Sequence, residues 1–191
     1  MSNPLRIEAL TEDRWRDLIE LFGPNGAYGG CWCMWWRETR AEFSRLGNEG
    51  NRAALREQLE QGHQIGLLGY ESGAVVAWCS VAPREEYPSL LRSPVLRPVD
   101  DRPVWSLVCL YVDKEARGRG LALDMLQGAV DYVAAQGGEI VEAYPTIPRE
   151  GKLPPVSSFM GTPKMYEAVG FVKVSQPSES RAIYRYLIQG S

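Results

Sequence analysis

Residues 104–136 constrain the fold more than any other part of this sequence. The apolar run Val104–Val112 predicts a buried strand, and a short polar spacer follows it. The spacer leads into the turn Arg117-Gly-Arg-Gly-Leu-Ala122, and Gly120–Ala135 then has the composition of a helix. Such a strand, turn and helix leave backbone N–H groups unpaired at the positive end of the helix. Because those groups bind phosphate oxygens, the segment predicts a phosphorylated cofactor.

The details of the turn distinguish three ways of holding phosphate. A P-loop requires G-x-x-x-x-G-K-[ST], and that string does not occur in the sequence. The dinucleotide fingerprint G-x-G-x-x-G fails because Leu123 stands where its third glycine would be. A third pattern, R/Q-x-x-G-x-G/A, is matched by Arg117, Gly120 and Ala122. In this pattern small residues let the backbone N–H groups of about residues 118–122 approach a pyrophosphate, and arginine side chains add charge.

The rest of the chain alternates helix and strand patterns without an internal repeat or a linker. Expected strands span residues 6–9, 65–70, 74–81, 139–144, 171–174 and 182–188, and expected helices span residues 11–22, 31–45, 51–61 and 163–169. Two proline-rich segments, 83–103 and 145–158, are long enough to be functional loops. This order predicts one α/β or α+β domain built around a single sheet.

Composition argues against several classes of protein. The chain has 191 residues, a net charge of −3 and a pI near 5.4, which argue against a nucleic-acid-binding surface. No apolar run approaches the length of a membrane span, and the N-terminus has no apolar signal core. We therefore expect a cytoplasmic protein that binds neither nucleic acid nor membrane.

The four cysteines, Cys31, Cys33, Cys79 and Cys109, are too few and too scattered for a disulfide scaffold. Cys31-Trp-Cys33 could begin a zinc site, but the chain has one histidine, His63, and no second closely spaced cysteine pair. We therefore expect no metal ion, and reduced, mostly buried thiols instead.

The strand, spacer and turn resemble the pattern of the GNAT superfamily of acyl-coenzyme A N-acyltransferases. In that pattern a strand ending L-x-V, here Leu110–Val112, precedes a polar spacer, the turn R-G-x-G-x-G/A and a long helix. A second match lies at Met165–Phe171, which is similar to the end of the family motif N-x-x-A-x-x-L-Y-E-K-x-G-F. Phe159 and Thr162 depart from its first half, which has Asn and Ala at these positions. The whole chain also resembles a group of bacterial GNAT proteins of undefined acceptor.

The resemblance implies a single N-acetyltransferase domain over residues 1–191, with a mixed sheet of about six to seven strands flanked by helices. It also implies acetyl-CoA as the cofactor, held by the end of the strand and by the turn. The implied cofactor-binding residues are Leu110, Tyr111, Val112, Arg117, Gly118, Arg119, Gly120, Leu121 and Ala122.

The resemblance further implies where the chemistry takes place. Backbone N–H groups of Leu110–Val112 would polarise the acyl carbonyl of a thioester that lies between two splayed central strands. Tyr166 is the candidate acid for the departing thiolate, and a core aromatic is the alternative. Glu142 is the candidate base, because a glutamate in an otherwise apolar strand calls for an explanation. The alternative, which the sequence leaves equally open, is that Glu142 is an ordinary acidic residue at the edge of the sheet or facing solvent.

An aromatic segment near the N-terminus has two interpretations. Tyr28, Trp32 and Trp36 recur at four-residue spacing and would form one stripe if a helix began early enough. By resemblance, the first helices wall the acceptor site, so the stripe could stack an aromatic acceptor or hold a cation over a ring. Arg37 could pair an acceptor carboxylate. The alternative is a helix that packs these large side chains into the core.

These inferences predict an acetyl-CoA-dependent N-acetyltransferase that moves an acetyl group to a primary amine of a small molecule by direct attack on the thioester. Acetylation of a protein lysine or N-terminus is one alternative, and a non-catalytic coenzyme A-binding module is another. The closing strands could also pair across a homodimer, although no residue in them indicates it.

Overall fold

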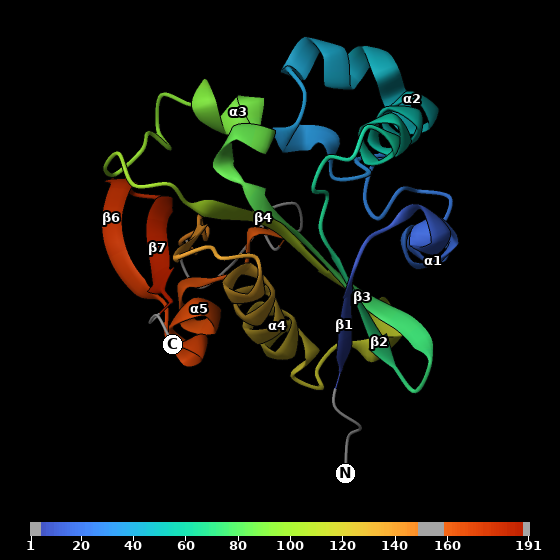
Figure 1. The fold of residues 1–191 in the computed structure, drawn as a ribbon. Coiled ribbons are helices and arrows are strands. Elements are labelled where there is room, and N and C mark those ends of the chain that lie inside the picture. The colour runs from blue at the N-terminus through green and yellow to red at the C-terminus, as the bar shows by residue number, and fades with distance from the viewer. Residues whose placement is uncertain (1–4, 149–158, 189–191) are drawn as a thin grey trace.

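The computed structural model describes residues 5–148 and 159–188. Its seven strands form one mixed sheet in the order β1-β2-β3-β4-β5-β7-β6 (Figure 1). This agrees with the mixed sheet of about six to seven strands that the resemblance implies. β4 and β5 are parallel, and the other neighbouring pairs are antiparallel. The strands are β1 (Arg6–Ala9), β2 (Leu67–Glu71), β3 (Ala74–Pro83), β4 (Trp105–Val112), β5 (Ile140–Ala143), β6 (Val172–Ser178) and β7 (Arg181–Leu187).

Helices cover both faces of this sheet, with α1 and α2 on one side and α4 and α5 on the other (Figure 1). The α-helices are α1 (Trp15–Phe22), α2 (Arg40–Glu60), α3 (Pro88–Leu91), α4 (Leu121–Ala135) and α5 (Pro163–Val169). Short 3-10 helices precede or connect them: η1 (Glu12–Arg14), η2 (Met34–Trp36), η3 (Arg84–Glu86) and η4 (Lys114–Ala116).

Each layer of helices packs against one face of the sheet and forms an apolar cluster with it. Leu126 and Val133 of α4 are fully buried in one cluster, together with Cys79 of β3. Leu18 of α1 is fully buried in the other cluster, together with Trp78 of β3. Neighbouring residues of β3 thus face opposite sides of the sheet, because side chains alternate along a strand. Burial of each such large apolar side chain stabilises the fold by about 1.5–3 kcal/mol.

The sheet opens between its two parallel strands. β5 pairs with β4 only through the register of Trp105, Ser106 and Leu107, so the later part of β4 has no β5 partner. On its other side β4 stays paired with β3 as far as Val112, with a bulge between Ser80 and Val81 of β3. The segment from Val108 to Val112 therefore presents one unpaired edge at the centre of the sheet, where a ligand can reach backbone groups.

The prediction of a helix over residues 31–45 is wrong. Trp32 and Cys33 have left-handed φ angles of 45° and 57°, which place a tight turn where the helix was expected. α2 begins only at Arg40, after Thr39 accepts a hydrogen bond from the Glu42 N–H at 3.1 Å. The break expected near residues 47–50 is a kink inside α2, where Gly47 has a φ of 61°.

Other local predictions are confirmed. α5 has the predicted bounds, and β2 and β3 form the predicted hairpin around Ser72 and Gly73. Of the expected loop at 145–158, residues 149–158 lie outside the described part of the chain. Within residues 5–148 and 159–188, no helix is both long enough and apolar enough to cross a membrane.

Candidate active site

The turn between β4 and α4 lines a cavity of about 290 Å³, which we call the turn cavity. Eight of the nine predicted cofactor-binding residues line it, and Arg119 is the exception. The turn cavity is lined by Leu110, Tyr111, Val112, Ala116, Arg117, Gly118, Gly120, Leu121, Ala122, Phe159 and Met165. The end of β4 and the start of α4 thus face the same space.

The backbone of this turn fits a pyrophosphate group. Gly118 and Gly120 have φ angles of 78° and 83°, which favour glycine, and a Cβ at either position would meet no atom within 4 Å. No side chain caps the N-terminus of α4. The first intrahelical bonds of α4 run from the Leu123 and Asp124 N–H groups to the Gly120 carbonyl oxygen. The N–H groups of Leu121 and Ala122 precede these bonds, so they have no intrahelical partner and lie at the positive end of the helix dipole. Exposed N–H groups of this kind bind phosphate oxygens.

The two arginines of the turn have different surroundings. Arg117 donates from Nε to the Val112 carbonyl oxygen at 2.9 Å, and its guanidinium carbon lies 5.9 Å from the centre of the Tyr111 ring. Arg119 instead donates from Nη1 to Glu71 of β2 at 2.7 Å. Arg117 is therefore placed to add positive charge to the turn cavity, whereas the charge of Arg119 is paired outside it.

A second cavity of about 320 Å³, which we call the aromatic cavity, lies between the segment before α2 and the sheet. Its walls come from four separate parts of the chain, and most of them are apolar or aromatic. The aromatic cavity is lined by Ala27, Tyr28, Gly29, Cys31, Cys33, Trp35, Trp36, Phe43, Val108, Cys109, Phe159, Met160 and Arg181.

Phe159 joins the two cavities because it lines both of them. Its ring centre lies 6.2 Å from that of Tyr111, with the planes 19° apart, and 5.6 Å from that of Tyr28. β4 also contributes to both, with Cys109 in the aromatic cavity and Leu110 in the turn cavity. The cavities therefore meet along the unpaired edge of β4, so one ligand in each could bring two reacting groups together.

The predicted acceptor residues divide into two pairs. Tyr28 and Trp36 line the aromatic cavity. Trp32 is instead 2% exposed, and its ring lies 5.6 Å from Phe22 in the core. Arg37 is 3% exposed and donates to the Gln64 carbonyl oxygen at 2.7 Å, away from the lining. The expected helical stripe does not form, because the left-handed backbone at Trp32 turns neighbouring side chains apart.

Tyr166 lies in the core and is not among the residues that line either cavity. It is fully buried, and its hydroxyl donates to the carbonyl oxygen of Met160, a lining residue of the aromatic cavity, at 3.0 Å. Burial raises the pKa of Tyr166 well above its ordinary value. The hydroxyl therefore stays protonated near neutral pH, so it can donate a hydrogen bond but cannot act as a base.

Glu142 is interior, at 1% exposure, but it lines neither cavity. Its carboxylate accepts from Arg84 at 3.0 Å, from Arg185 at 2.7 Å and from the Tyr144 hydroxyl at 2.8 Å. Arg185 also pairs with Asp100. The carboxylate of Glu142 is thus enclosed by two guanidinium groups and a hydroxyl, away from the space that a ligand could enter. The placement therefore favours a structural role over the predicted role as base.

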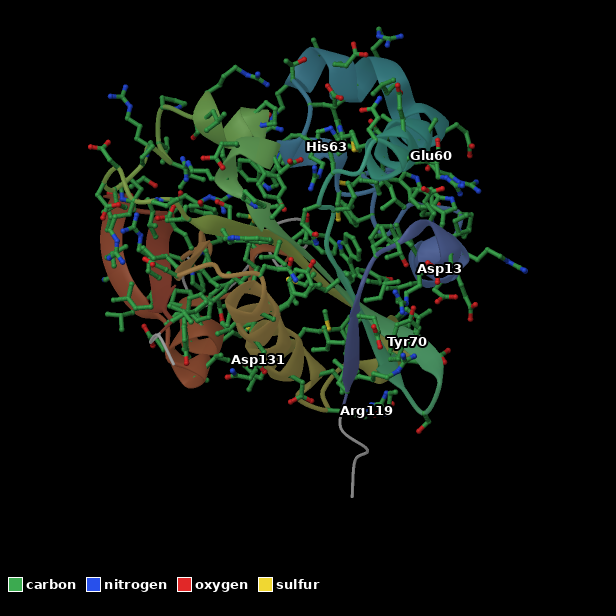
Figure 2. The ribbon with its side chains drawn as sticks, in the orientation of Figure 1. Asp13, Glu60, His63, Tyr70, Arg119 and Asp131 are labelled. Atoms are coloured by element: carbon green, nitrogen blue, oxygen red, sulfur yellow. The ribbon has the colours of Figure 1, made fainter. Side chains whose placement is uncertain are left out.

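The thiols and the histidine do not form a nucleophilic pair. Cys33 and Cys109 lie with their sulfurs 3.3 Å apart, and this hydrogen bond together with burial raises the pKa of Cys33. Burial raises the pKa of Cys31 to about 11, so this thiol also stays protonated. His63 pairs with Glu86 at 2.9 Å and lies at the opposite end of the molecule from Arg119 (Figure 2). Within the described residues, no three His, Cys, Asp or Glu side chains are grouped to hold a metal ion.

Among the lining residues that were not predicted as site residues, Phe159 and Arg181 bear most on what the cavities can bind. The sequence could have indicated Phe159, because this residue replaces the Asn of the family motif. In the structure it lies where both cavities meet. No sequence pattern indicates Arg181, which is simply the first residue of β7. Only the tertiary structure brings it to the aromatic cavity.

The comparisons with known proteins agree with the predicted family and fold. The family model described as the acetyltransferase (GNAT) family matches residues 32–151, and the chain belongs to this family. The family uses acetyl-CoA, which makes acetyl-CoA the cofactor of this chain. A comparison of the sequence with curated proteins finds no significant match.

Solved structures share the fold at low sequence identity. The polyamine N-acetyltransferase of Drosophila melanogaster, which forms N-acetylagmatine, has a TM-score of 0.58 at 11% identity, over 96% of this chain and 100% of its own. The yncA protein of Salmonella typhimurium, solved with acetyl-CoA, has a TM-score of 0.55 at 14% identity, over 99% and 96%. PaiA N-acetyltransferase of Thermoplasma acidophilum, solved with coenzyme A, has a TM-score of 0.53 at 12% identity, over 96% and 99%.

Proposed function

We propose that this protein transfers an acetyl group from acetyl-CoA to a primary amine of a small molecule. The observation that carries the proposal is the pair of cavities that meet at Phe159 and along the free edge of β4. The turn cavity has the features of a pyrophosphate site. The aromatic cavity has the size and enclosure of a site for a small acceptor.

The turn and the end of β4 would hold the cofactor. Backbone N–H groups at Gly118–Ala122 would bind the pyrophosphate, and Arg117 would add a side-chain charge. Leu110–Val112 would lie along the acyl-bearing arm, because they form the wall that leads from the turn towards the aromatic cavity. The unpaired edge of β4 supplies backbone donors for the carbonyl oxygen of the acyl group.

When bound, acetyl-CoA supplies a thioester carbonyl that a neutral amine attacks, so that an N–C bond forms and the C–S bond breaks. Donors on β4 would stabilise the negative charge that develops on the carbonyl oxygen. Tyr166 is the proposed hydrogen-bond donor to the departing sulfur, since its hydroxyl stays protonated. No carboxylate or histidine is among the described residues that line the aromatic cavity, so the amine proton would pass to water.

A small acceptor is favoured over a protein segment by the aromatic cavity. Its walls are side chains from four parts of the chain, and its volume of about 320 Å³ suits a compact molecule. Among solved structures of the same fold are an agmatine and a polyamine N-acetyltransferase, whose acceptors are small amines. A non-catalytic coenzyme A-binding module remains the second candidate function, because none of the lining residues is a strong base.

Release of free coenzyme A in the presence of a panel of small amines tests the proposal. The matched variants are Gly120→Ala and Gly137→Ala, at the two ends of α4, with φ angles of 83° and 78° and open space around both. Both substitutions should cost about 1 kcal/mol of folding free energy through left-handed strain. Only Gly120→Ala should weaken acetyl-CoA binding, by about tenfold or more, because only Gly120 lines the turn cavity.

Two results would contradict the proposal in different ways. Equal acetyl-CoA affinity in both variants would show that the turn does not hold the cofactor. Tight acetyl-CoA binding without coenzyme A release for any amine, in a protein that is otherwise folded, would support the binding module instead.

A further inference from the structure

The aromatic cavity has an unusual balance of charge for a site that accepts an amine. Arg181 is the only ionisable side chain with a permanent charge in its described lining, and no carboxylate is among those lining residues. Arg40 adds a second positive charge nearby, with its guanidinium carbon 3.3 Å from the centre of the Trp35 ring. The surroundings of a bound acceptor are therefore apolar and positive.

Arg181 has donors available for a ligand. Its Nη1 donates to the Tyr144 carbonyl oxygen at 3.2 Å and to Thr146 Oγ1 at 3.0 Å, which fixes the guanidinium at the start of β7. Neither partner is charged, and no ion pair joins Arg181 to a carboxylate within residues 5–148 and 159–188. Burial lowers the pKa of Arg181, as expected where no anion compensates for lost water.

A guanidinium held in this way favours one kind of ligand group. Its planar set of N–H donors matches the two oxygens of a carboxylate, and an anion would supply the charge that the lining lacks. A polyamine or guanidinium acceptor would instead place a second cation beside Arg181, without a carboxylate to compensate for its desolvation.

The aromatic side chains specify the rest of the ligand. Tyr28, Trp35, Trp36 and Phe159 present rings to the cavity, and Tyr28 and Trp35 keep exposed fractions of 49% and 39%. An aromatic ring that packs against such side chains gains about 0.5–1.5 kcal/mol beyond the area that it buries. A flat apolar ligand body would use these faces.

We propose that the acceptor is an aromatic amine that carries a carboxylate, with its ring among Tyr28, Trp36 and Phe159 and its carboxylate on Arg181. This inference rests on the proposed function, because it names the acceptor of that same site. Burial in the apolar lining lowers the pKa of the bound ammonium group, so the amine loses its proton to water before it attacks. This accounts for a lining without a carboxylate base.

Binding of three amines to the protein saturated with coenzyme A tests the inference by isothermal titration calorimetry. The probes are L-phenylalanine, its decarboxylated analogue phenethylamine, and agmatine. L-Phenylalanine should bind at least about tenfold more tightly than either other amine, because only it offers both a ring and a carboxylate. The measurement does not depend on turnover.

Variants locate the preference at Arg181. Arg181→Gln should weaken L-phenylalanine binding about tenfold or more while phenethylamine binding changes less than twofold, and Arg181→Lys should keep part of the preference. The matched control is Arg45→Gln, which removes an exposed arginine of α2 that pairs only with Glu42 in the described contacts and should change neither affinity. A melting temperature within a few degrees of wild type confirms that each variant is folded.

The inference is overturned if L-phenylalanine shows no measurable binding, if phenethylamine or agmatine binds as tightly, or if Arg181→Gln weakens all ligands equally. Release of coenzyme A with other amines would then leave the proposed function intact. Loss of the proposed function itself has a different signature, since the wild-type protein would fail to bind acetyl-CoA or to release coenzyme A with any amine.

Discussion

Tyr166 differs from the other buried tyrosines in the partner of its hydroxyl. It donates to the backbone of Met160, so the hydroxyl points towards the segment that separates the core from the aromatic cavity. Tyr87 is equally buried, but its hydroxyl meets Ser80 within a different cluster. A short shift of residues 159–160 would free the Tyr166 hydroxyl for a ligand, whereas the Tyr87 hydroxyl is held by the Ser80 side chain.

Tyr166→Phe should lower kcat at least about tenfold while the affinity for acetyl-CoA changes less than twofold, because the variant loses a donor and not a wall of the turn cavity. Steady-state kinetics and calorimetry with acetyl-CoA measure the two quantities. Tyr87→Phe is the control, since it removes one buried hydroxyl at a cost of about 1 kcal/mol without touching the site. Wild-type turnover in Tyr166→Phe would refute the proposed role.

Among the elements, β4 and α4 form the part of the molecule on which the cofactor site depends. β3 pairs with β4 along the whole length of β4 and holds it in place. β5 pairs only with the first residues of β4, so the opposite edge of β4 is open beyond them. α4 is anchored by Met125, Leu126 and Val130, which are buried against the sheet. The turn between two packed elements therefore holds its N–H groups in place before a ligand binds, which reduces the entropy cost of binding.

The N-termini of α2 and α5 differ in how they are capped, and this gives a test at the level of single elements. Thr39 accepts a hydrogen bond from the Glu42 N–H, whereas Thr162 makes no side-chain cap bond at α5. Thr39→Ala should therefore lower the free energy of unfolding by about 1 kcal/mol, and Thr162→Ala should lower it by much less. Urea denaturation of both variants measures the difference, and equal losses would show that the Thr39 cap does not stabilise α2.

For the molecule as a whole, the ion cluster around Glu142 joins parts that are distant in the chain. Glu142 of β5 bonds to Arg84, 58 residues earlier, and to Arg185 of β7, 43 residues later. Arg185 extends the cluster to Asp100, and this contact lowers the pKa of that carboxyl. Because these charges are mostly buried, removal of one partner leaves the others uncompensated.

Glu142→Gln should lower the free energy of unfolding by about 3–5 kcal/mol, since two buried guanidinium groups lose their shared counter-charge. Chemical denaturation measures the loss, and Glu139→Gln, at a side chain 80% exposed, is the control with little expected effect. In the fraction that stays folded, the dependence of kcat/KM on pH should be that of wild type. A stable variant that loses a titrating group from this profile would restore Glu142 as the base.

Much of the fold follows from the sequence because its signals are local. The strand, the turn and α4 are adjacent in the chain, and glycines at left-handed positions mark the turn directly. α5 begins at Pro163 and ends before Gly170, which are residues that start and stop helices on their own. Residues 31–39 were mispredicted because aromatic spacing suggests a helix, whereas packing of Trp32 against Phe22 selects a left-handed turn.

The sequence by itself determined the family pattern and the turn that we propose as the cofactor site, because phosphate recognition by a turn needs only neighbouring residues and their backbone conformation. The acceptor half was decided by the tertiary structure alone. Its lining joins residues 27–43 to Cys109, Phe159 and Arg181, and no local pattern records that proximity. The same holds for Glu142, the predicted catalytic base, because its guanidinium partners come from other elements and place it at the centre of a buried ion cluster. Contacts of this kind form only when the sheet assembles, because the strands that carry them are far apart in the chain.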